Sequence, residues 1–418
     1  MILAKPAPFV SAFIDAVDEA IRQDHPPSGM SALQRTWLAF CVTATLVTHS
    51  ICWARFERAS LGTYAMAALS WMFRHSKIPW DQLLVASVRV ILRHHGITSG
   101  SLVLDDTDNP RSKAANKLAY LYKLRDKESG GYIWGQSLLF LLLVTPKISI
   151  PVGFVFYLPD PELSTWYRRE KARKKQKAPK AQRRPKPAPH PDYPTKQQLA
   201  LRLLEAFKVN HPDLRIHCIA ADALYGTALF VDAASALFAG VQVLSQIRSN
   251  QNIRIGKRQQ HVADYFATHP GTPKRICIRG GEEIVAMVSS ARLYVCSHKT
   301  KRFVVAMKYE HEQAYRYLIA SDLTWRTLDI VQGHSLRWLV EVFIQDWKGH
   351  EGWAQLTKQP GEEGARQSVI LSLLVDHSLF IHPAQQAQLK NNLPAYTVGS
   401  LRANVQVACL VDVIDDLV

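Results

Sequence analysis

Three acidic residues in separate parts of the chain could form one catalytic site. Asp105 lies at the carboxyl end of the strand predicted from SLVLDDT, and Asp222 lies at the carboxyl end of the strand predicted from IHCIAAD. Glu341 lies within HSLRWLVEVFIQDWKGHE, whose apolar spacing predicts a helix. In a sheet flanked by helices, sites form outside the carboxyl ends of the strands, so we expect the two aspartates to meet there.

Carboxylates of this kind suit metal-dependent chemistry. Their hard oxygens match Mg²⁺ or Mn²⁺, and two such ions, roughly 4 Å apart, serve phosphodiester chemistry by activating one oxygen and stabilising another. Without metal, three clustered carboxylates repel one another, which raises their pKa values. Each residue also has an ordinary explanation, because Asp often ends a strand or caps a helix and a helical Glu often forms a surface ion pair.

The helix predicted around Glu341 carries two more charges on the same face. Arg337, Glu341 and Lys348 are four and then seven residues apart, which aligns them at 3.6 residues per turn. An apolar stripe runs beside them, made by Leu336, Leu339, Val340, Phe343 and Trp347. The charged face therefore borders the core, where Glu341 could approach the edge of a sheet.

Alternation and apolar runs predict that sheet. The segments SLVLDDT, GYIWGQSLLFLLLV and SIPVGFVFYL read as three antiparallel strands. Helices and strands then alternate from Gln198 to Ile247, which favours a sheet flanked by helices. Short strands separated by Gly, His and Lys clusters follow, which predicts an antiparallel β insertion.

Composition indicates a globular protein with a polyanionic partner. The chain has 418 residues, 47% of them hydrophobic, and 51 Lys+Arg against 35 Asp+Glu give a net charge of +16. Such an excess favours nucleic acid first and an anionic membrane surface second. The six scattered cysteines lack zinc-finger spacing and predict free thiols in a reducing cytoplasm. The longest apolar run, 138–144, is shorter than the roughly 20 residues of a membrane span.

Much of the positive charge lies in one segment. From Arg168 to Lys186 there are eleven basic residues and one acidic residue, followed by a Pro-rich stretch. Such a segment cannot bury a core, so we expect a mobile, basic, Pro-rich loop over 166–195. A solvated loop and an arm that grips phosphates are compatible interpretations. The basic residues most directly implicated are Arg168, Arg169, Lys174 and Lys175.

Three blocks in order resemble DDE transposases of bacterial insertion sequences, specifically the insertion-sequence-4-like group. LVLDDT resembles the first-Asp strand, and AADALYG resembles the second-Asp block. HSLRWLVEVFIQDWK resembles the third block, Tyr-x₂-Arg-x₃-Glu-x₆-Lys, with Arg337, Glu341 and Lys348 at the matching spacing. His334 stands at the Tyr position, which is a departure from the pattern. The resemblance covers about residues 100–355.

The resemblance implies an RNase-H-like fold, that is, an α/β mixed sheet flanked by helices, with a β-rich insertion before the helix of the catalytic Glu. We expect a helical N-terminal region that either packs or binds DNA. We divide the chain into that region (1–97), the first part of the catalytic domain (98–250), the insertion (251–326), the catalytic-domain helices (327–385) and a tail (386–418).

The resemblance also implies roles for single residues. Asp105, Asp222 and Glu341 would hold two Mg²⁺ or Mn²⁺ ions, with Asp106 as the alternative to Asp105. Arg337 and Lys348 would contact DNA phosphates near the cut, and His334, at the Tyr position, would also belong to the DNA-binding residues. Trp338 would either stack on a displaced base or pack in the core.

The function implied is metal-dependent cleavage at transposon ends and strand transfer into target DNA. The partners implied are double-stranded DNA and a second copy of the chain, because two ends must be joined; no membrane partner is expected. The location implied is the bacterial cytoplasm, at the nucleoid when DNA is bound. An RNase-H-like nuclease without strand transfer uses the same carboxylates, and a catalytically inactive DNA-binding derivative is a further alternative.

Overall fold

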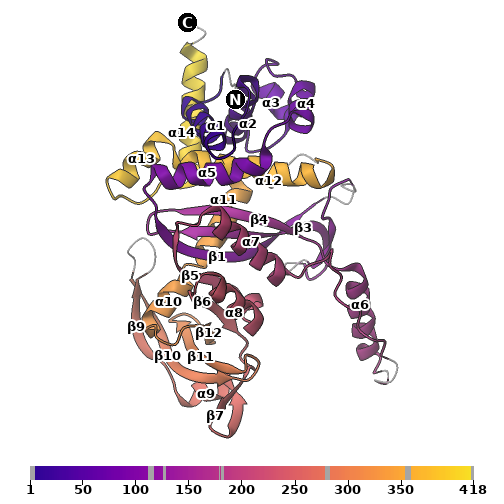
Figure 1. The fold of residues 1–418 in the computed structure, drawn as a ribbon, viewed down its shortest axis with the longest axis vertical. Coiled ribbons are helices and arrows are strands. Elements are labelled where there is room, and N and C mark those ends of the chain that lie inside the picture. The colour runs from indigo at the N-terminus through magenta and orange to yellow at the C-terminus, as the bar shows by residue number, and fades with distance from the viewer. Residues whose placement is uncertain are drawn as a thin grey trace.

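The computed structural model describes residues 5–111, 117–125, 129–177, 179, 183–277, 283–353 and 359–415. Figure 1 shows three tiers: a helical layer that holds both termini, a sheet beneath it, and a lobe of strands at the far end. One helix, α6 (Pro161–Lys175), extends away from these tiers. Residues 178 and 180–182 of the segment expected to be a basic loop lie outside the described residues.

The catalytic fold predicted from the sequence is confirmed in the central sheet. Strand β1 (Ser99–Pro110) pairs antiparallel with β3 (Tyr132–Val144), which pairs antiparallel with β4 (Ser149–Tyr157). On its other side β1 runs parallel to β5 (Arg215–Ala221), and β5 runs parallel to β6 (Gln242–Ile247). The order β4-β3-β1-β5-β6 is the RNase-H-like arrangement. A short strand, β2 (Tyr122–Arg125), pairs with the beginning of β3.

The β-rich insertion extends the same sheet. Its last strand, β12 (Arg316–Ala320), pairs antiparallel with β6, so that the described strands form one 12-stranded sheet. Helix α9 (Val262–Thr268) lies between the second and third strands of the insertion. The remaining strands are β7 (Asn252–Ile255), β8 (Arg258–His261), β9 (Thr272–Cys277), β10 (Glu283–Val295) and β11 (Thr300–Tyr309).

Helices cover both faces of the central strands, which explains the continuous apolar run of β3. Leu139, Leu141 and Leu143 pack on the face covered by α7 (Lys196–Asn210) and α8 (Ala228–Leu237). Leu138, Phe140 and Leu142 pack on the opposite face, against α11 (Trp338–His350). The preceding helix, α10 (Thr327–Ser335), packs on that second face beside β5 and β6.

The predicted helical N-terminal region is confirmed, and it shares one core with helices from the other end of the chain. Side chains of α1, α2 and α5 pack with those of α12 and α14. A capping box of Ser31 and Gln34 fixes the start of α2. The helices of this layer are α1 (Pro8–Asp24), α2 (Ala32–Thr48), α3 (Trp53–Ala59), α4 (Met66–His75), α5 (Trp80–His94), α12 (Gly361–Phe380), α13 (Pro383–Lys390) and α14 (Val398–Asp415).

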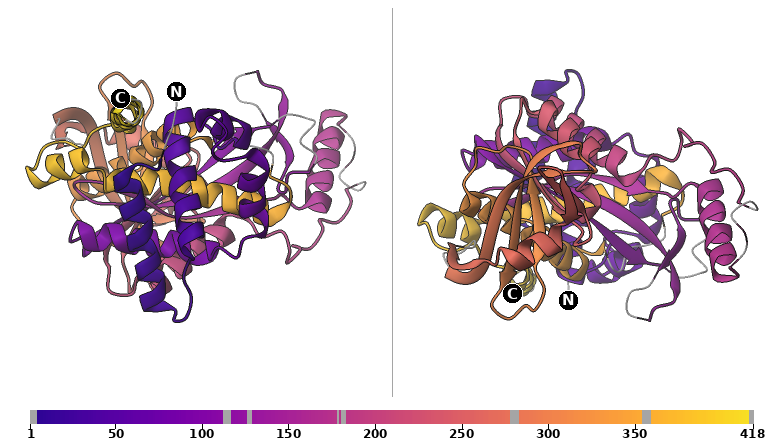
Figure 2. Two further views of the ribbon diagram at one scale, coloured as in Figure 1. Left: turned by 90° about the horizontal axis from the view of Figure 1, so that it is seen from above. Right: turned by 90° about the horizontal axis from the view of Figure 1, so that it is seen from below.

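The loop prediction is wrong for residues 166–175, which belong to helix α6. Asp160 caps the helix through the backbone N–H groups of Glu162 and Leu163, and Pro161 occupies its first turn. Glu170, buried despite its charged surroundings, accepts two hydrogen bonds from Arg173. Charge density predicted a loop because this local neutralisation is not visible in composition. Figure 2 shows α6 standing apart from the body in both views.

Membrane-spanning potential is confined to one bent pair of helices. Within the described residues, no single helix is long and apolar enough to cross a bilayer. Helices α2 and α3, bent by 87° at the break between them, together have the length and composition of a membrane span. Most side chains of α2 are buried in the helical core.

Candidate active site

The pairing of β1 with β5 brings the two predicted aspartates side by side. Leu104 pairs with Ala221 across the parallel strands, so Asp105 and Asp222 are the next residues on each chain segment. Along both strands alternate residues face opposite sides, and Val103 and Ala220 face α11. Asp105 and Asp222 continue this alternation, which places them on the α11 side. Asp222 also caps a 3₁₀ turn, Ala223–Tyr225, through the Ala223 N–H.

Arg337 joins the first aspartate to the predicted glutamate. It lies at the break between α10 and α11, and its guanidinium donates from Nη1 to Asp105 Oδ2 at 2.7 Å. Nη2 of the same group donates to Glu341 Oε1 at 2.6 Å. Asp105 and Glu341, 236 positions apart in the chain, thus converge on one cation.

The electrostatics of this site centre on Asp105. Asp105 is only 9% exposed, and burial raises the pKa of its carboxyl group from 3.8 to about 6. The Asp106 N–H and the Arg337 charge oppose this shift, whereas the charges of Asp222 and Asp106 add to it. Glu341 is more open, with about half of its side chain exposed. A partly desolvated carboxylate beside others is an arrangement that a bound cation stabilises.

Asp105 and Asp106 point to opposite faces of the sheet. The carboxylate of Asp106 forms an ion pair with Lys196 at the start of α7. The Tyr225 hydroxyl is buried without a hydrogen-bond partner among the described residues, and its pKa is raised, first by burial and next by the charge of Asp106. The geometry therefore favours Asp105 over Asp106 as the residue that faces Glu341.

The other residues predicted near the cut have different positions. Lys348 donates from Nζ to the Asp108 carbonyl at 2.6 Å and is partly buried. His334 is 5% exposed and its Nε2 lies 3.2 Å from the Gln246 amide nitrogen; burial lowers its pKa to about 3. His334 is therefore a neutral, buried group here and does not lie at the surface where a phosphate would bind. Trp338 is 62% exposed, so packing in the core does not explain it.

The basic residues of α6 lie apart from this site. Arg168, Arg169, Lys174 and Lys175 are all exposed on the projecting helix. The structure brings together Asp105, Asp222, Arg337 and Glu341, and it does not bring the α6 cations to them.

A comparison with known families adds an independent finding. Residues 56–288, more than half of the chain, match the family described as DDE superfamily endonuclease. The chain belongs to this family. The match includes Asp105 and Asp222 and ends before Glu341. Among solved structures, the NurA nuclease from Sulfolobus solfataricus is similar over 56% of this chain and 72% of that chain, with 8% identity and a TM-score of 0.23. No curated protein matches the chain.

DDE superfamily endonucleases generally use divalent metal ions, and the residues of this one fit such an ion in type. Asp105, Asp222 and Glu341 offer hard oxygens, and the Arg337 guanidinium marks a position where positive charge already satisfies two of them. The distances between these carboxylates, however, are larger than a metal site requires. Within the described ranges, no group of three His, Cys, Asp or Glu side chains lies close enough to hold a metal ion.

Sequence reasoning missed two residues beside Asp106, on the face of the sheet opposite Glu341. Lys196 follows the basic, Pro-rich segment 166–195, so nothing marked one further Lys as the partner of Asp106. Tyr225 lies three positions after Asp222, inside the block AADALYG, and its place there was the available signal.

Asp105→Asn is expected to change how stability depends on pH. The folded carboxyl has a pKa of about 6 against 3.8 for an ordinary Asp, so the unfolded state binds fewer protons between these values. The free energy of unfolding should therefore fall as the pH rises from about 4 to about 6, by up to about 3 kcal/mol. Urea denaturation across this interval should show wild type losing stability relative to the variant.

Asp329→Asn provides a control of opposite sign. Arg326 lowers the pKa of Asp329 on the surface of α10, so the stability it contributes is lost only as the pH falls through that lowered pKa. Parallel curves for wild type and Asp105→Asn would mean that Asp105 titrates normally.

Proposed function

We propose that the protein is a DNA transposase of the insertion-sequence-4-like group, which cleaves transposon ends and joins them to target DNA. The observation that carries the proposal is the convergence of Asp105 and Glu341 on Arg337, beside Asp222, in a chain of the DDE endonuclease family. Glu341 lies outside the family match, so this convergence supports its assignment independently. A dimer on DNA belongs to the proposal because two ends must be joined.

The carboxylates, Trp338 and Lys348 would have three different roles in this reaction. Asp105, Asp222 and Glu341 would hold two Mg²⁺ or Mn²⁺ ions, which when bound activate an attacking oxygen and stabilise a leaving one. Trp338, exposed next to Arg337, would stack on a displaced base. Lys348 would hold the end of β1 in place through its hydrogen bond to the Asp108 carbonyl. Its role would therefore be to position the strand and not to contact a phosphate directly.

Substitution of the carboxylates tests this function. Asp222→Asn and Glu341→Gln should each abolish cleavage and joining, because a lost ligand removes the charge that holds a metal, while DNA binding stays within about twofold of wild type. The assay uses a labelled duplex carrying the element's end, a plasmid target and Mg²⁺, and it scores nicked and joined products separately.

Asp329→Asn removes a carboxylate from the preceding helix, α10, outside the site, and this matched control should stay active. Joined product in wild type supports a transposase. Nicking without joining would instead identify a nuclease, and binding alone would identify an inactive derivative. Full activity in EDTA would remove the metal from the mechanism.

Arg337 and a metal ion would compete for the same atoms. The oxygens that accept its two hydrogen bonds, Asp105 Oδ2 and Glu341 Oε1, are those that a cation between these residues would need. The other oxygen of Asp105 already accepts the Asp106 N–H. A DNA phosphate near Trp338 would offer the guanidinium an alternative partner with similar geometry. DNA binding would thus release the carboxylates for metal.

Removal of Arg337 should therefore strengthen metal binding in the absence of DNA. We expect Arg337→Gln to bind Mn²⁺ at least tenfold more tightly than wild type, measured as free Mn²⁺ by electron paramagnetic resonance. Adding Asp105→Asn should cancel the gain. Arg326→Gln, which breaks a surface Arg–Asp pair on α10, controls for the loss of one positive charge.

The possible results separate two failures. Equal Mn²⁺ affinity in wild type and Arg337→Gln, with loss in Asp105→Asn, would leave the metal site intact and reject the competition. No Mn²⁺ binding by any variant, with or without DNA, would reject the metal-dependent function itself. Thermal unfolding of Arg337→Lys, which keeps the charge but cannot bridge both carboxylates, checks that the fold survives at this position.

Helix α6 would supply non-specific grip on DNA. Two basic residues fold this arm: Arg173 of α6 bonds Glu170, and Arg183, which follows the helix, lies 5.0 Å from the centre of the Trp166 ring. The four implicated earlier are exposed and outside this small core. Because exposed cations on a projecting helix can follow a phosphate backbone, they would add affinity without reading sequence.

Replacing Arg168, Arg169, Lys174 and Lys175 together by Gln should lower the salt dependence of DNA binding. At about 0.9 per phosphate contact, the slope of log affinity against log salt should become shallower by up to about 3.6. The matched control replaces four exposed cations on the insertion, namely Lys257, Arg258, Lys274 and Lys299. Equal changes in both variants would mean that net charge, and not α6, sets the slope.

A further inference from the structure

A second cationic site lies at the opposite end of β1 from Asp105. A pocket of about 500 Å³ opens between the end of α5, the beginning of β1, the turn between β3 and β4, and the end of α13. Ser99 in its wall is six residues before Asp105, about 20 Å along an extended strand. The pocket is therefore separate from the carboxylate site.

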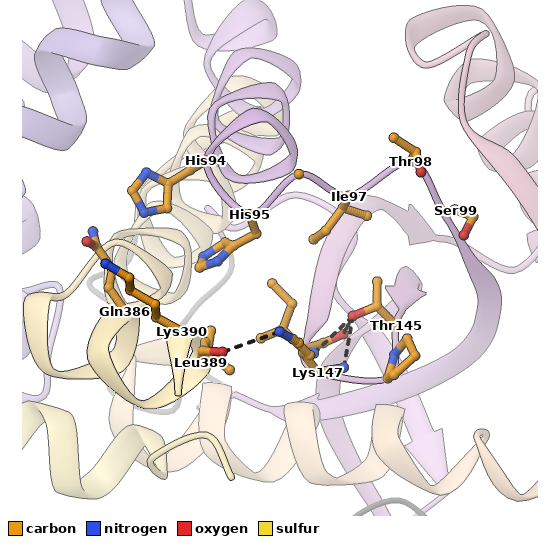
Figure 3. A pocket seen from close by; sticks show the side chains of 13 residues that line it. His94, His95, Ile97, Thr98, Ser99, Thr145, Lys147, Gln386, Leu389 and Lys390 are labelled. Carbon is orange, nitrogen blue, oxygen red and sulfur yellow. Dashed lines mark hydrogen bonds between the residues drawn. The ribbon is translucent and has the colours of Figure 1, made fainter. Parts of the chain in front are cut away.

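Every ionisable side chain that lines this pocket is basic. His94, His95, Lys147 and Lys390 come from three parts of the chain far apart in sequence, and the described residues of the lining include no Asp or Glu. Figure 3 shows His94, Gln386 and Lys390 together on one side, Thr98 and Ser99 on the other, and His95 and Lys147 between them. Hydroxyl and amide groups thus line the same pocket as the basic side chains, and such a mixture of donors suits phosphate oxygens.

Two of the four basic groups are already used by the fold. Lys147 Nζ donates to the Leu389 carbonyl at 3.3 Å, and His95 Nε2 lies 3.1 Å from the Phe380 carbonyl. These contacts fix the turn and the end of α5 against α12 and α13. They therefore shape the pocket, and Lys147 places positive charge at its wall, whereas burial lowers the pKa of His95.

The other two, His94 and Lys390, make no hydrogen bond or ion pair to any described residue. Basic residues at the ends of helices often satisfy terminal carbonyls. Here backbone N–H groups do so already: Ile97 bonds the Leu92 carbonyl at the end of α5, and Leu393 bonds the Gln388 carbonyl at the end of α13. Helix capping therefore does not account for His94 and Lys390, whose side-chain nitrogens remain available to a ligand.

We propose that this pocket binds a phosphate group attached to an organic substituent. The basic and hydroxyl groups would hold the phosphate, and the volume of about 500 Å³ leaves space for a nucleoside next to apolar atoms of Ile97, Ile148 and Leu389. The phosphate could belong to a free nucleotide or to a DNA strand that crosses this face. Both sources share one chemistry, and the experiment below separates them.

The experiment compares wild type with the double variant His94→Gln and Lys390→Gln. The probes are inorganic phosphate, 2′-deoxyadenosine 5′-monophosphate and a 20-bp duplex, each followed by titration calorimetry at fixed salt. We expect the double variant to bind the monophosphate at least tenfold more weakly than wild type, and Lys390→Arg to retain binding. The control, Lys257→Gln with His261→Gln, removes the same residue types from an exposed part of the insertion.

The three probes identify the source of the phosphate. Loss of monophosphate binding with unchanged duplex affinity would assign the pocket to a small nucleotide, whereas a matching tenfold loss for the duplex would assign it to DNA. Both results support the site. Equal affinity of wild type and the double variant for every probe, or an equal loss in the control, would overturn it.

Discussion

A carboxylate buried in a sheet needs a positive charge beside it, and this requirement organises the region around Asp105. Removing such a group from water is unfavourable unless it is paired or neutralised. Arg337 provides the charge from a helix on the far side of a long insertion. For its guanidinium to reach Asp105, α11 must lie at one register against β1 and β3. The pairing therefore constrains helix, sheet and insertion together.

Aromatic packing fixes that register. The Phe140 ring on β3 lies 5.3 Å from Phe343 and 4.7 Å from Trp347, both with T-shaped geometry, and Trp347 stacks on Trp353 at 4.5 Å. At the end of the same helix, Lys348 bonds the Asp108 carbonyl. Rings and an ammonium group thus hold α11 at several points, which leaves Arg337 and Glu341 little freedom of backbone position. What can still move is the guanidinium itself.

The sequence predicted these elements wherever a pattern was local. An apolar run identified β1, alternation identified β5, and the four-residue spacing placed Arg337 beside Glu341, because each of these depends only on local sequence. The meeting of Asp105 with Arg337 depends on how α11 crosses the sheet, which no spacing encodes. The same limit explains Lys196, whose ion pair with Asp106 joins residues 90 apart. Helix α6 was missed because the features that favour it, the Asp160 cap and the Arg173–Glu170 pair, are single residues beside many basic ones.

Residues at the start of α7 join the projecting helix to the carboxylates. Thr195 and Gln198 form the capping box that begins α7, immediately after the basic segment. The next two side chains then hold both aspartate blocks: Lys196 pairs with Asp106, and Gln197 donates to the Leu224 carbonyl at 2.6 Å. Two polar contacts therefore attach the start of α7 to residues near Asp105 and Asp222. The projecting segment that contains α6 can therefore be long and exposed while the strand ends keep their positions, because the chain is fixed again at Thr195–Gln198.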